Sequence, residues 1–140
     1  MKRRLFSRPP AFLLRVGKSV AGMGLFAAEP IPEGRFIIEY WGKIANDEVS
    51  NRVAGRYLFD LSNGKTILGG TRKNIARYVN HACRPNAEAR QYGNRIHIYS
   101  KKRIEAGQEI TYNYGKEYFN AYIKPHGCAC ATCTKKKKAS

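Results

Sequence analysis

Short apolar and β-branched runs, separated by turns rich in Gly and Pro, recur along the whole chain. The run at residues 35–41 combines aromatic and β-branched side chains, a composition typical of β-strands. At residues 95–100, apolar and polar side chains alternate with the period of two that a half-buried strand shows. The same criteria predict further strands at residues 12–16, 24–28, 57–61, 66–68 and 109–114.

Turn signals fill the intervals between these runs. Clusters of Gly, Pro, Ser and Asn predict turns or loops at residues 17–23, 30–34, 62–65 and 104–108. Only two segments, residues 46–53 and 74–81, have patterns that allow short helices. Many short strands, frequent turns and little helix together predict a mostly β fold of several small sheets.

The composition is that of one globular domain. The chain has 140 residues, of which 43% are hydrophobic and 11% are aromatic. No apolar run approaches the roughly 20 residues needed to span a bilayer, and no secretory signal follows the basic N-terminus. We therefore expect no membrane contact, and a cytoplasmic, nucleoid or nuclear location in a reducing compartment.

The charge is strongly positive. Lys and Arg number 26 against 10 Asp and Glu, which gives a formal net charge of +16. Such an excess attracts polyanions or acidic protein surfaces, so nucleic acid is a candidate partner of the basic surface. The Lys run at residues 135–138 is typical of a solvated tail. The carboxylates that could make a local groove acidic are Glu29, Glu33, Glu39, Asp47, Glu48 and Asp60.

Two polar motifs could hold a ligand. Gly22 and Gly24 flank Met23, and two glycines so close allow a backbone to approach a ligand, although a plain tight turn is the alternative. Their spacing is not that of a dinucleotide-binding loop. Adjacent Asn80 and His81 offer amide and imidazole groups for a polar cofactor, or could simply lie at a capped helix end.

Three tyrosines could surround an amine. Tyr112 and Tyr114 alternate along a predicted strand and so share one of its faces. With Tyr57 they could line a narrow aromatic slot, which suits the ammonium and the apolar stem of a lysine. A plain aromatic core face is the alternative interpretation.

The four cysteines are unevenly placed. Cys128, Cys130 and Cys133 form a C-x-C-x-x-C cluster, and Cys83 lies far upstream. In a reducing compartment such clustering favours a tetrahedral zinc site over disulfides or unligated thiols. Cys83 is the remaining cysteine for the fourth position, and His126 is a competing ligand.

Taken in order, these motifs resemble the SET-domain lysine methyltransferases with a post-SET zinc segment. The resemblance covers about residues 12–133, and its most specific piece is the Asn-His-x-Cys-x-Pro-Asn motif that begins at Asn80. The matching pieces are Gly22-Met-Gly-Leu-Phe26, Glu39-Tyr-Trp-Gly42, Tyr57-Leu-Phe-Asp-Leu61, Asn74-Ile-Ala-Arg-Tyr-Val-Asn-His-Ala-Cys83 with Pro85-Asn86, Gly107-Gln-Glu-Ile-Thr-Tyr-Asn-Tyr-Gly115 and the terminal cysteines.

The resemblance implies a fold and a division of the chain. The family fold is mostly β, with several small sheets and a pseudoknot where the Asn-His segment crosses the strand of Tyr112 and Tyr114. It implies a basic leader at residues 1–11 and a SET domain at 12–117. A zinc-binding post-SET segment at 118–134 and a Lys-rich tail at 135–140 follow.

The resemblance also implies an activity. Methyl groups from S-adenosylmethionine pass to the ε-amine of a lysine in a histone or another basic, ribosomal or nucleoid protein, with mainly monomethyl and some dimethyl product. The residues implied at the transfer point are Tyr114, Tyr112 and Tyr57. Those implied to bind the cofactor are Lys18, Gly22, Met23, Gly24, Tyr40, Arg77, Asn80, His81 and Tyr118. Those implied to bind zinc are Cys83, Cys128, Cys130 and Cys133.

Some positions depart from the family pattern. Met23 replaces a frequent Trp, Ala82 a frequent Ser and Asn113 a frequent Asp. The terminal cysteine spacing is also shorter than the common C-x-C-x4-C. Two other functions therefore compete with the enzyme, a basic nucleic-acid-binding zinc protein and an inactive SET scaffold.

Overall fold

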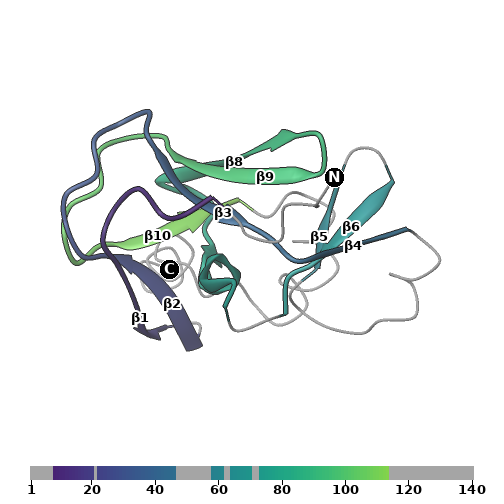
Figure 1. Ribbon diagram of the computed structural model, residues 1–140. Helices are drawn as coiled ribbons and strands as arrows, with labels where there is room; N and C mark the ends of the chain where they lie inside the picture. The colour runs from purple at the N-terminus through teal and green to yellow at the C-terminus, as the bar shows by residue number, and fades with distance from the viewer. Residues whose placement is uncertain (1–7, 21, 47–57, 62–63, 71–72, 114–140) are drawn as a thin grey trace.

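Ten strands and one short helix make up the part of the chain that the computed structural model describes, namely residues 8–20, 22–46, 58–61, 64–70 and 73–113 (Figure 1). The strands form three small sheets, which confirms the predicted mostly β fold. The four-stranded sheet has the order β1 (Leu14–Ser19), β2 (Gly22–Ala27), β10 (Glu109–Tyr112), β7 (Asn80–His81). The second sheet has the order β3 (Phe36–Tyr40), β9 (Arg95–Ser100), β8 (Ala87–Tyr92). The third has the order β4 (Lys43–Asn46), β6 (Lys65–Leu68), β5 (Leu58–Asp60).

The core lies where the inward faces of these sheets meet. Ile96 and Ile98 of β9 are buried on the alternate positions that the sequence pattern predicted. Leu25 of β2 and Ile110 of β10 are fully buried and lie opposite each other in the antiparallel β2–β10 pair. Each such side chain stabilises the fold by roughly 1.5–3 kcal/mol relative to an exposed one.

The β10 strand connects parts of the chain that are distant in sequence. It pairs antiparallel with β2 and parallel with β7, with Thr111 opposite Asn80 and Tyr112 opposite His81. The Asn-His segment therefore lies directly against the strand of Tyr112, as the resemblance implies for the crossing of these two segments. In Figure 1 the β1–β2 hairpin and the β4–β6–β5 sheet lie at opposite ends of the molecule.

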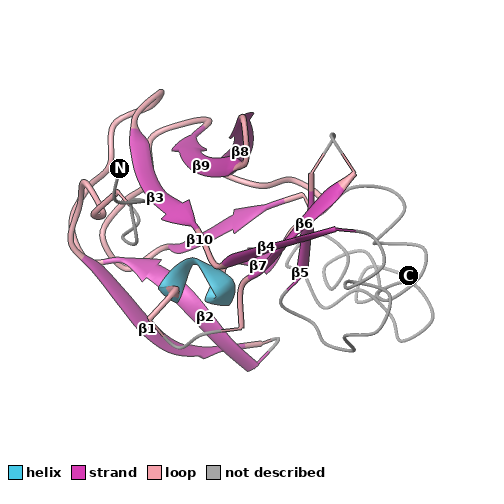
Figure 2. Ribbon diagram, turned by 45° about the vertical axis from the view of Figure 1, so that its right-hand side comes forward, coloured by secondary structure: helices cyan, strands magenta, loops and turns pink. Residues whose placement is uncertain are grey.

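The helix predicted at residues 74–81 is confirmed only as one short turn and is wrong for the other half of its length. A single turn of 3₁₀ helix, η1 (Ile75–Tyr78), contacts β2 and β3 (Figure 2), and the chain is extended from Val79 onward. The physical reason is tertiary: pairing with β10 satisfies the backbone of Asn80 and His81 and overrides a weak local helix preference. Of the other predicted helix, residues 47–53 lie outside the described residues, and Asn46 ends strand β4.

The loop predicted at residues 17–23 is also wrong for most of its length. Strands β1 and β2 remain paired as far as Lys18 opposite Met23 and Ser19 opposite Gly22. Gly22 has φ +107°, a conformation that side-chain-bearing residues rarely adopt, so the hairpin reverses direction next to it. Cross-strand hydrogen bonding therefore decides the structure of a segment whose composition is typical of a loop.

Two asparagine side chains, one buried and one half-buried, hydrogen-bond to the backbone of other segments. Asn74 is fully buried; its Oδ1 accepts a hydrogen bond from the Trp41 amide at 3.2 Å, and its Nδ2 donates to Gly69 O at 3.0 Å. Asn86 donates to Glu109 O at 2.8 Å and accepts from the Thr111 amide at 3.0 Å. A backbone group that is buried without a partner costs about 1–3 kcal/mol, and less where it is half-buried, so both side chains have a structural role.

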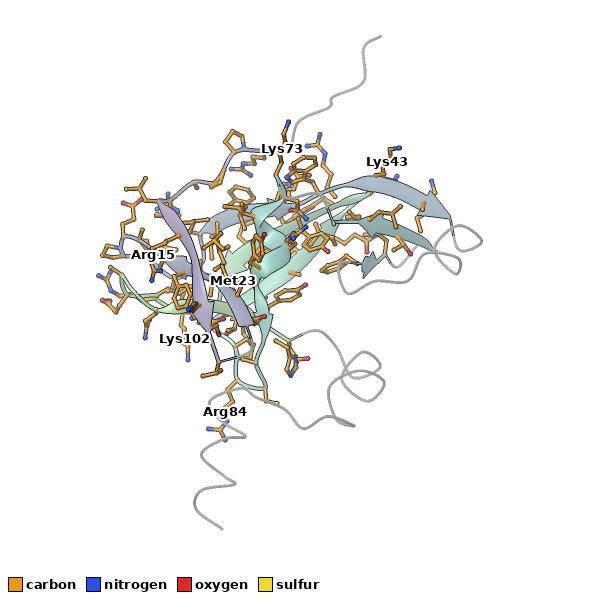
Figure 3. The ribbon with its side chains drawn as sticks, turned by 90° about the horizontal axis from the view of Figure 1, so that it is seen from below. Arg15, Met23, Lys43, Lys73, Arg84 and Lys102 are labelled. Atoms are coloured by element: carbon orange, nitrogen blue, oxygen red, sulfur yellow. The ribbon has the colours of Figure 1, made fainter. Side chains whose placement is uncertain are left out.

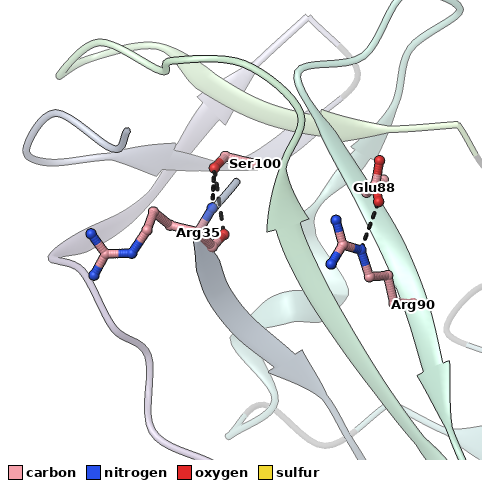
Figure 4. A network of polar contacts seen from close by, with 4 residues as sticks. All are labelled: Arg35, Glu88, Arg90 and Ser100. Atoms are coloured by element: carbon pink, nitrogen blue, oxygen red, sulfur yellow. Dashed lines mark hydrogen bonds and ion pairs between the residues drawn. The ribbon is translucent and has the colours of Figure 1, made fainter. Parts of the chain in front are cut away.

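A buried hydroxyl fixes the start of β3. Ser100 is 1% exposed, and its Oγ accepts from the Arg35 amide at 2.9 Å (Figure 4). The same Oγ donates to Pro32 O at 2.6 Å. On the neighbouring strand, Arg90 and Glu88 form an exposed ion pair at 2.7 Å that contributes little to stability. No helix in the described ranges has the length and apolar character needed to cross a membrane.

Candidate active site

A hydrogen-bonded cluster forms where β1, β2, β7 and β10 meet. Asn80 Nδ2 donates to Met23 O at 2.9 Å and to Glu109 Oε2 at 2.8 Å. Ser19 Oγ donates to the other carboxylate oxygen of Glu109 at 2.8 Å. One carboxylate therefore joins the end of the β1–β2 hairpin to the Asn-His segment. We call these residues, together with Gly24, the Asn80–Glu109 cluster.

The Glu109 carboxylate occupies space that a side chain at position 24 would fill. A Cβ at position 24 would lie 2.5 Å from Glu109 Oε2, which is too close for a real contact, and 3.0 Å from the Ser19 Cβ, which is tight. A side chain at position 24 would therefore force the Glu109 carboxylate to move from its present place. This steric constraint is separate from the close approach of a ligand to the backbone that the Gly-Met-Gly motif predicted. Gly22 differs, because its Cβ would meet nothing within 4 Å and its positive φ is the constraint.

Apolar side chains are exposed beside this polar cluster. Met23 is 48% exposed and Val20 is 83% exposed, both at the end of the β1–β2 hairpin. Lys18 is exposed too and lies opposite Met23 in the ladder. Apolar side chains next to a few fixed polar groups are the usual lining of a small-molecule site. Because the Asn80 amide nitrogen is used within the cluster, its Oδ1 is the atom that can receive a hydrogen bond from a ligand.

His81 faces a different environment from its neighbour. Its imidazole is half-buried, and burial lowers its pKa below the ordinary value of 6.5, which favours the neutral ring. His81 Nε2 lies 3.6 Å from Cys83 Sγ. The strand register also fixes this segment, because the Ala82 amide donates to Tyr112 O at 3.2 Å.

An aromatic row follows Tyr112 away from the cluster. The Tyr112 ring is 7% exposed and stacks on Phe59 with centroids 6.1 Å apart and planes 11° apart. Phe59 in turn packs on Tyr40, with centroids 5.3 Å apart. The three rings come from β10, β5 and β3. Tyr40 was predicted to bind a cofactor, and its 5% exposed ring lies in this row.

Arg77 holds the backbone on the other side of η1. Its Nη1 donates to Gly70 O, and its guanidinium carbon lies 4.9 Å from the centre of the Tyr78 ring. These contacts tie η1 to the segment that follows β6. None of these contacts involves the Asn80–Glu109 cluster.

The structure brings together part of the predicted site. Met23, Gly24 and Asn80 meet in one cluster, and His81 and Tyr112 are register partners. Sequence reasoning missed Glu109, Ser19 and Phe59. Of these, Glu109 was the most detectable, as a carboxylate two residues before Thr111 on a predicted strand. The predicted site residues that lie outside the described residues are Tyr57, Tyr114, Tyr118, Cys128, Cys130 and Cys133, with the alternative ligand His126.

Of the four predicted zinc ligands, Cys83 alone lies among the described residues, and it is half-buried. Among residues 8–20, 22–46, 58–61, 64–70 and 73–113, no group of three or more His, Cys, Asp or Glu side chains could hold a metal ion. The zinc site therefore stays a prediction.

Comparison with known proteins identifies relatives of the chain. A family model described as the SET domain matches residues 22–115. Histone-lysine N-methyltransferase ATXR7 of Arabidopsis thaliana is 36% identical over 104 residues, which are 65% of this chain and 7% of that protein. Histone-lysine N-methyltransferase 2D of Homo sapiens is 33% identical over 129 residues, or 83% of this chain and 2% of that protein. The crystal structure of Arabidopsis thaliana SUVH6 in complex with SAM superposes with a TM-score of 0.70 and 27% identity, over 76% of this chain and 28% of that one. The chain thus spans a small fraction of the length of these relatives.

The Gly24–Glu109 contact gives a direct test of the cluster. We expect Gly24→Ala to lower the free energy of unfolding by about 1–3 kcal/mol, because the new Cβ displaces the Glu109 carboxylate from Ser19 and Asn80. In a Glu109→Ala background the same change should cost less than about 1 kcal/mol. Urea unfolding of the four proteins measures this coupling.

Gly22→Ala is the matched control. Its cost of about 1–3 kcal/mol comes from a positive φ, so removing Glu109 should leave it unchanged. Equal costs of Gly24→Ala with and without Glu109 would show that the carboxylate does not constrain position 24.

Proposed function

The chain belongs to the SET-domain family, and from that premise we propose that it is a protein-lysine methyltransferase that uses S-adenosylmethionine. The observation that carries the proposal is the register of β7 against β10. It puts Asn80 and His81 beside the strand of Tyr112, while Asn80 also bonds to the hairpin end at Met23. Asn80 and His81, implied to bind the cofactor, and Tyr112, implied to contact the substrate lysine, thus lie on one pair of strands.

The residues present fit the proposed cofactor. Asn80 Oδ1 would accept from the amino-acid end, and exposed Met23 would pack on an apolar part. When bound, S-adenosylmethionine supplies a methyl group on a sulfonium sulfur, an electrophile that needs no further activation. Glu109 acts as a positioning residue, because its carboxylate fixes the Asn80 amide. We include Lys18, His81, Tyr118 and the hairpin backbone in the same binding role.

The substrate amine must reach the site uncharged. A free lysine has a pKa of about 10.4, and removal from water lowers this value. The buried rings of Tyr112 and Tyr40, with the half-buried ring of Phe59 between them, exclude water from one side of β10. We assign Tyr114 the role of orienting the amine, and Tyr57 a place in the channel wall. Alignment and desolvation are then the main contributions of the protein to the rate.

The proposed substrates are histones or other basic nucleoid or ribosomal proteins. Both relatives described above are named histone-lysine N-methyltransferases. Action on such a substrate corresponds to a nuclear or nucleoid location. Methyl transfer distinguishes this proposal from its two alternatives, because neither an inactive scaffold nor a plain nucleic-acid-binding protein would transfer methyl groups.

Transfer of label tests the activity. We expect the protein to move radioactive methyl from S-adenosylmethionine to lysine in a mixture of histones and other basic proteins. Tyr114→Phe should lower the rate about 100-fold, which is typical of losing one positioned hydroxyl at a reacting centre. Tyr92→Phe, which removes an exposed hydroxyl on β8, should leave the rate unchanged. Absence of transfer to every protein offered, with the fold intact by circular dichroism, would favour the scaffold.

We propose mainly monomethyl-lysine, with some dimethyl-lysine, as the product. A Tyr112 hydroxyl and a water held by it would occupy the space that a methylated amine needs for a second transfer. The ring itself is fixed by stacking on Phe59 and stays in place when the hydroxyl is removed.

Tyr112→Phe should therefore raise the rate of the second transfer about tenfold, which corresponds to about 1.4 kcal/mol. Mass spectrometry of a methylated peptide should show more di- and trimethyl-lysine, while the first transfer stays within about twofold. Tyr99→Phe on β9 is the control. Mostly trimethyl product from the wild-type protein, or an unchanged product from Tyr112→Phe, would refute the assignment.

We further propose one zinc ion per chain, held by Cys83, Cys128, Cys130 and Cys133. Cys83 fits a ligand role because it is half-buried and lies two residues from His81, on a segment fixed by β10. Four thiolates are a usual donor set for structural zinc. The ion would then couple the C-terminal segment to the sheet.

Metal analysis tests this site. Purified protein should contain one zinc per chain, and Cys83→Ser should lose most of it. His126→Gln should retain the metal, because His126 is only the competing ligand. If Cys83→Ser keeps the zinc and His126→Gln loses it, His126 and not Cys83 is the fourth ligand. Metal-free protein with full activity would rule out the site.

A further inference from the structure

A basic pocket adjoins the Asn80–Glu109 cluster without sharing a residue with it. It has a volume of about 380 Å³ and lies between the segment after β7 and the connection from β9 to β10. None of its lining residues belongs to the cluster. The lining residues are Arg84, Asn86, Lys102, Arg103, Glu105, Gln108 and Thr111.

The charge of this pocket is not balanced. Three cationic side chains line it against a single carboxylate, and that carboxylate, Glu105, pairs with Arg103. Arg84 and Lys102 are both exposed, and neither forms an ion pair or side-chain hydrogen bond within the described ranges. Within the part of the chain that the structure describes, these two cations are thus left for a ligand.

The floor of the pocket is rigid and polar. Both polar atoms of the Asn86 side chain bond to the β10 backbone, and the Gln108 Oε1 accepts from the Glu105 amide at 2.8 Å. The lining contains no aromatic and no aliphatic side chain, so an acyl chain would have nothing to pack on. Phosphate oxygens suit such a site, because they bind Arg and Lys without apolar contact.

The net charge of +16 favours an extended polyanion as the source of that phosphate. A basic protein substrate would be repelled by this charge unless a local groove were acidic. Glu39, one of the carboxylates considered for that role, is 4% exposed and accepts a hydrogen bond from the Arg8 amide at 2.7 Å. A nucleic acid to which the basic substrate is already bound also attracts this chain, because both proteins are positively charged.

We propose that Arg84 and Lys102 bind the phosphate backbone of duplex DNA without regard to base sequence. The pocket would thereby hold a DNA-bound protein substrate against the enzyme, and this second part rests on the proposed methyltransferase function. Successive side chains of a strand point to opposite faces, so Thr111 in the pocket and Tyr112 in the aromatic row do not compete for space.

The chain provides a matched pair of control residues. Lys43 and Lys73 are exposed, like Arg84 and Lys102, and lie on the opposite side of the molecule (Figure 3). Arg84→Gln/Lys102→Gln and Lys43→Gln/Lys73→Gln therefore remove the same charge from two different places. Circular dichroism and thermal unfolding should show that both variants are folded.

Fluorescence anisotropy of a labelled duplex DNA of mixed sequence, titrated at several NaCl concentrations without S-adenosylmethionine, measures the binding. Loss of Arg84 and Lys102 should weaken affinity about tenfold or more and lower the slope of log K against log salt by about 2, because each phosphate contact contributes nearly one unit. The control pair should weaken affinity less than about threefold. Either single pocket variant should lower the slope by about 1.

Equal weakening by both pairs would show that only net charge matters and would overturn the proposal. Unchanged affinity of the pocket variant would do the same. Displacement of the DNA from the pocket at lower concentration by poly-glutamate than by unlabelled DNA would assign the pocket to an acidic protein instead. Methyl transfer to a free peptide is assayed separately. DNA binding without transfer would overturn the enzyme proposal alone, and transfer without pocket-dependent DNA binding would overturn this one alone.

Discussion

The short parallel contact between β7 and β10 is the constraint on which the candidate site depends. Thr111 opposite Asn80 and Tyr112 opposite His81 hold extended a segment that local pattern alone would make helical. In the extended form, neighbouring side chains point to opposite faces of the sheet. Asn80 therefore reaches Glu109 and the β1–β2 hairpin, while His81 lies beside Cys83. Two adjacent residues thus serve two separate environments.

Glu109 turns this contact into a fixed arrangement. Its two carboxylate oxygens accept from Ser19 and Asn80, which come from opposite flanks of β10 in the four-stranded sheet. Hydrogen bonds to an ionised group are stronger than neutral ones, so each contact limits the rotation of the side chain that donates it. The absence of a side chain at Gly24 is the steric condition for this arrangement.

The sequence pattern was most informative where strands are buried on one or both faces. Strands β3 and β9 were predicted because their apolar residues alternate or run together. Strand β8 was not predicted, since Ala, Glu, Arg and Gln are good helix formers, and pairing along β9 is what makes it a strand. In the site, Met23, Gly24 and Asn80 could be found from motifs. The contact of Ser19 with Glu109 spans 90 positions, which no local pattern encodes.

Asn86 has a consequence for how the molecule behaves among its own copies. Strand β7 has only two residues, so part of the β10 edge would otherwise present unsatisfied backbone groups. The Asn86 amide fills the place of a neighbouring strand by bonding to Glu109 O and the Thr111 amide. Open strand edges are templates for intermolecular β-pairing and aggregation. A single side chain therefore closes this edge and protects a sheet-rich protein from assembling with itself there.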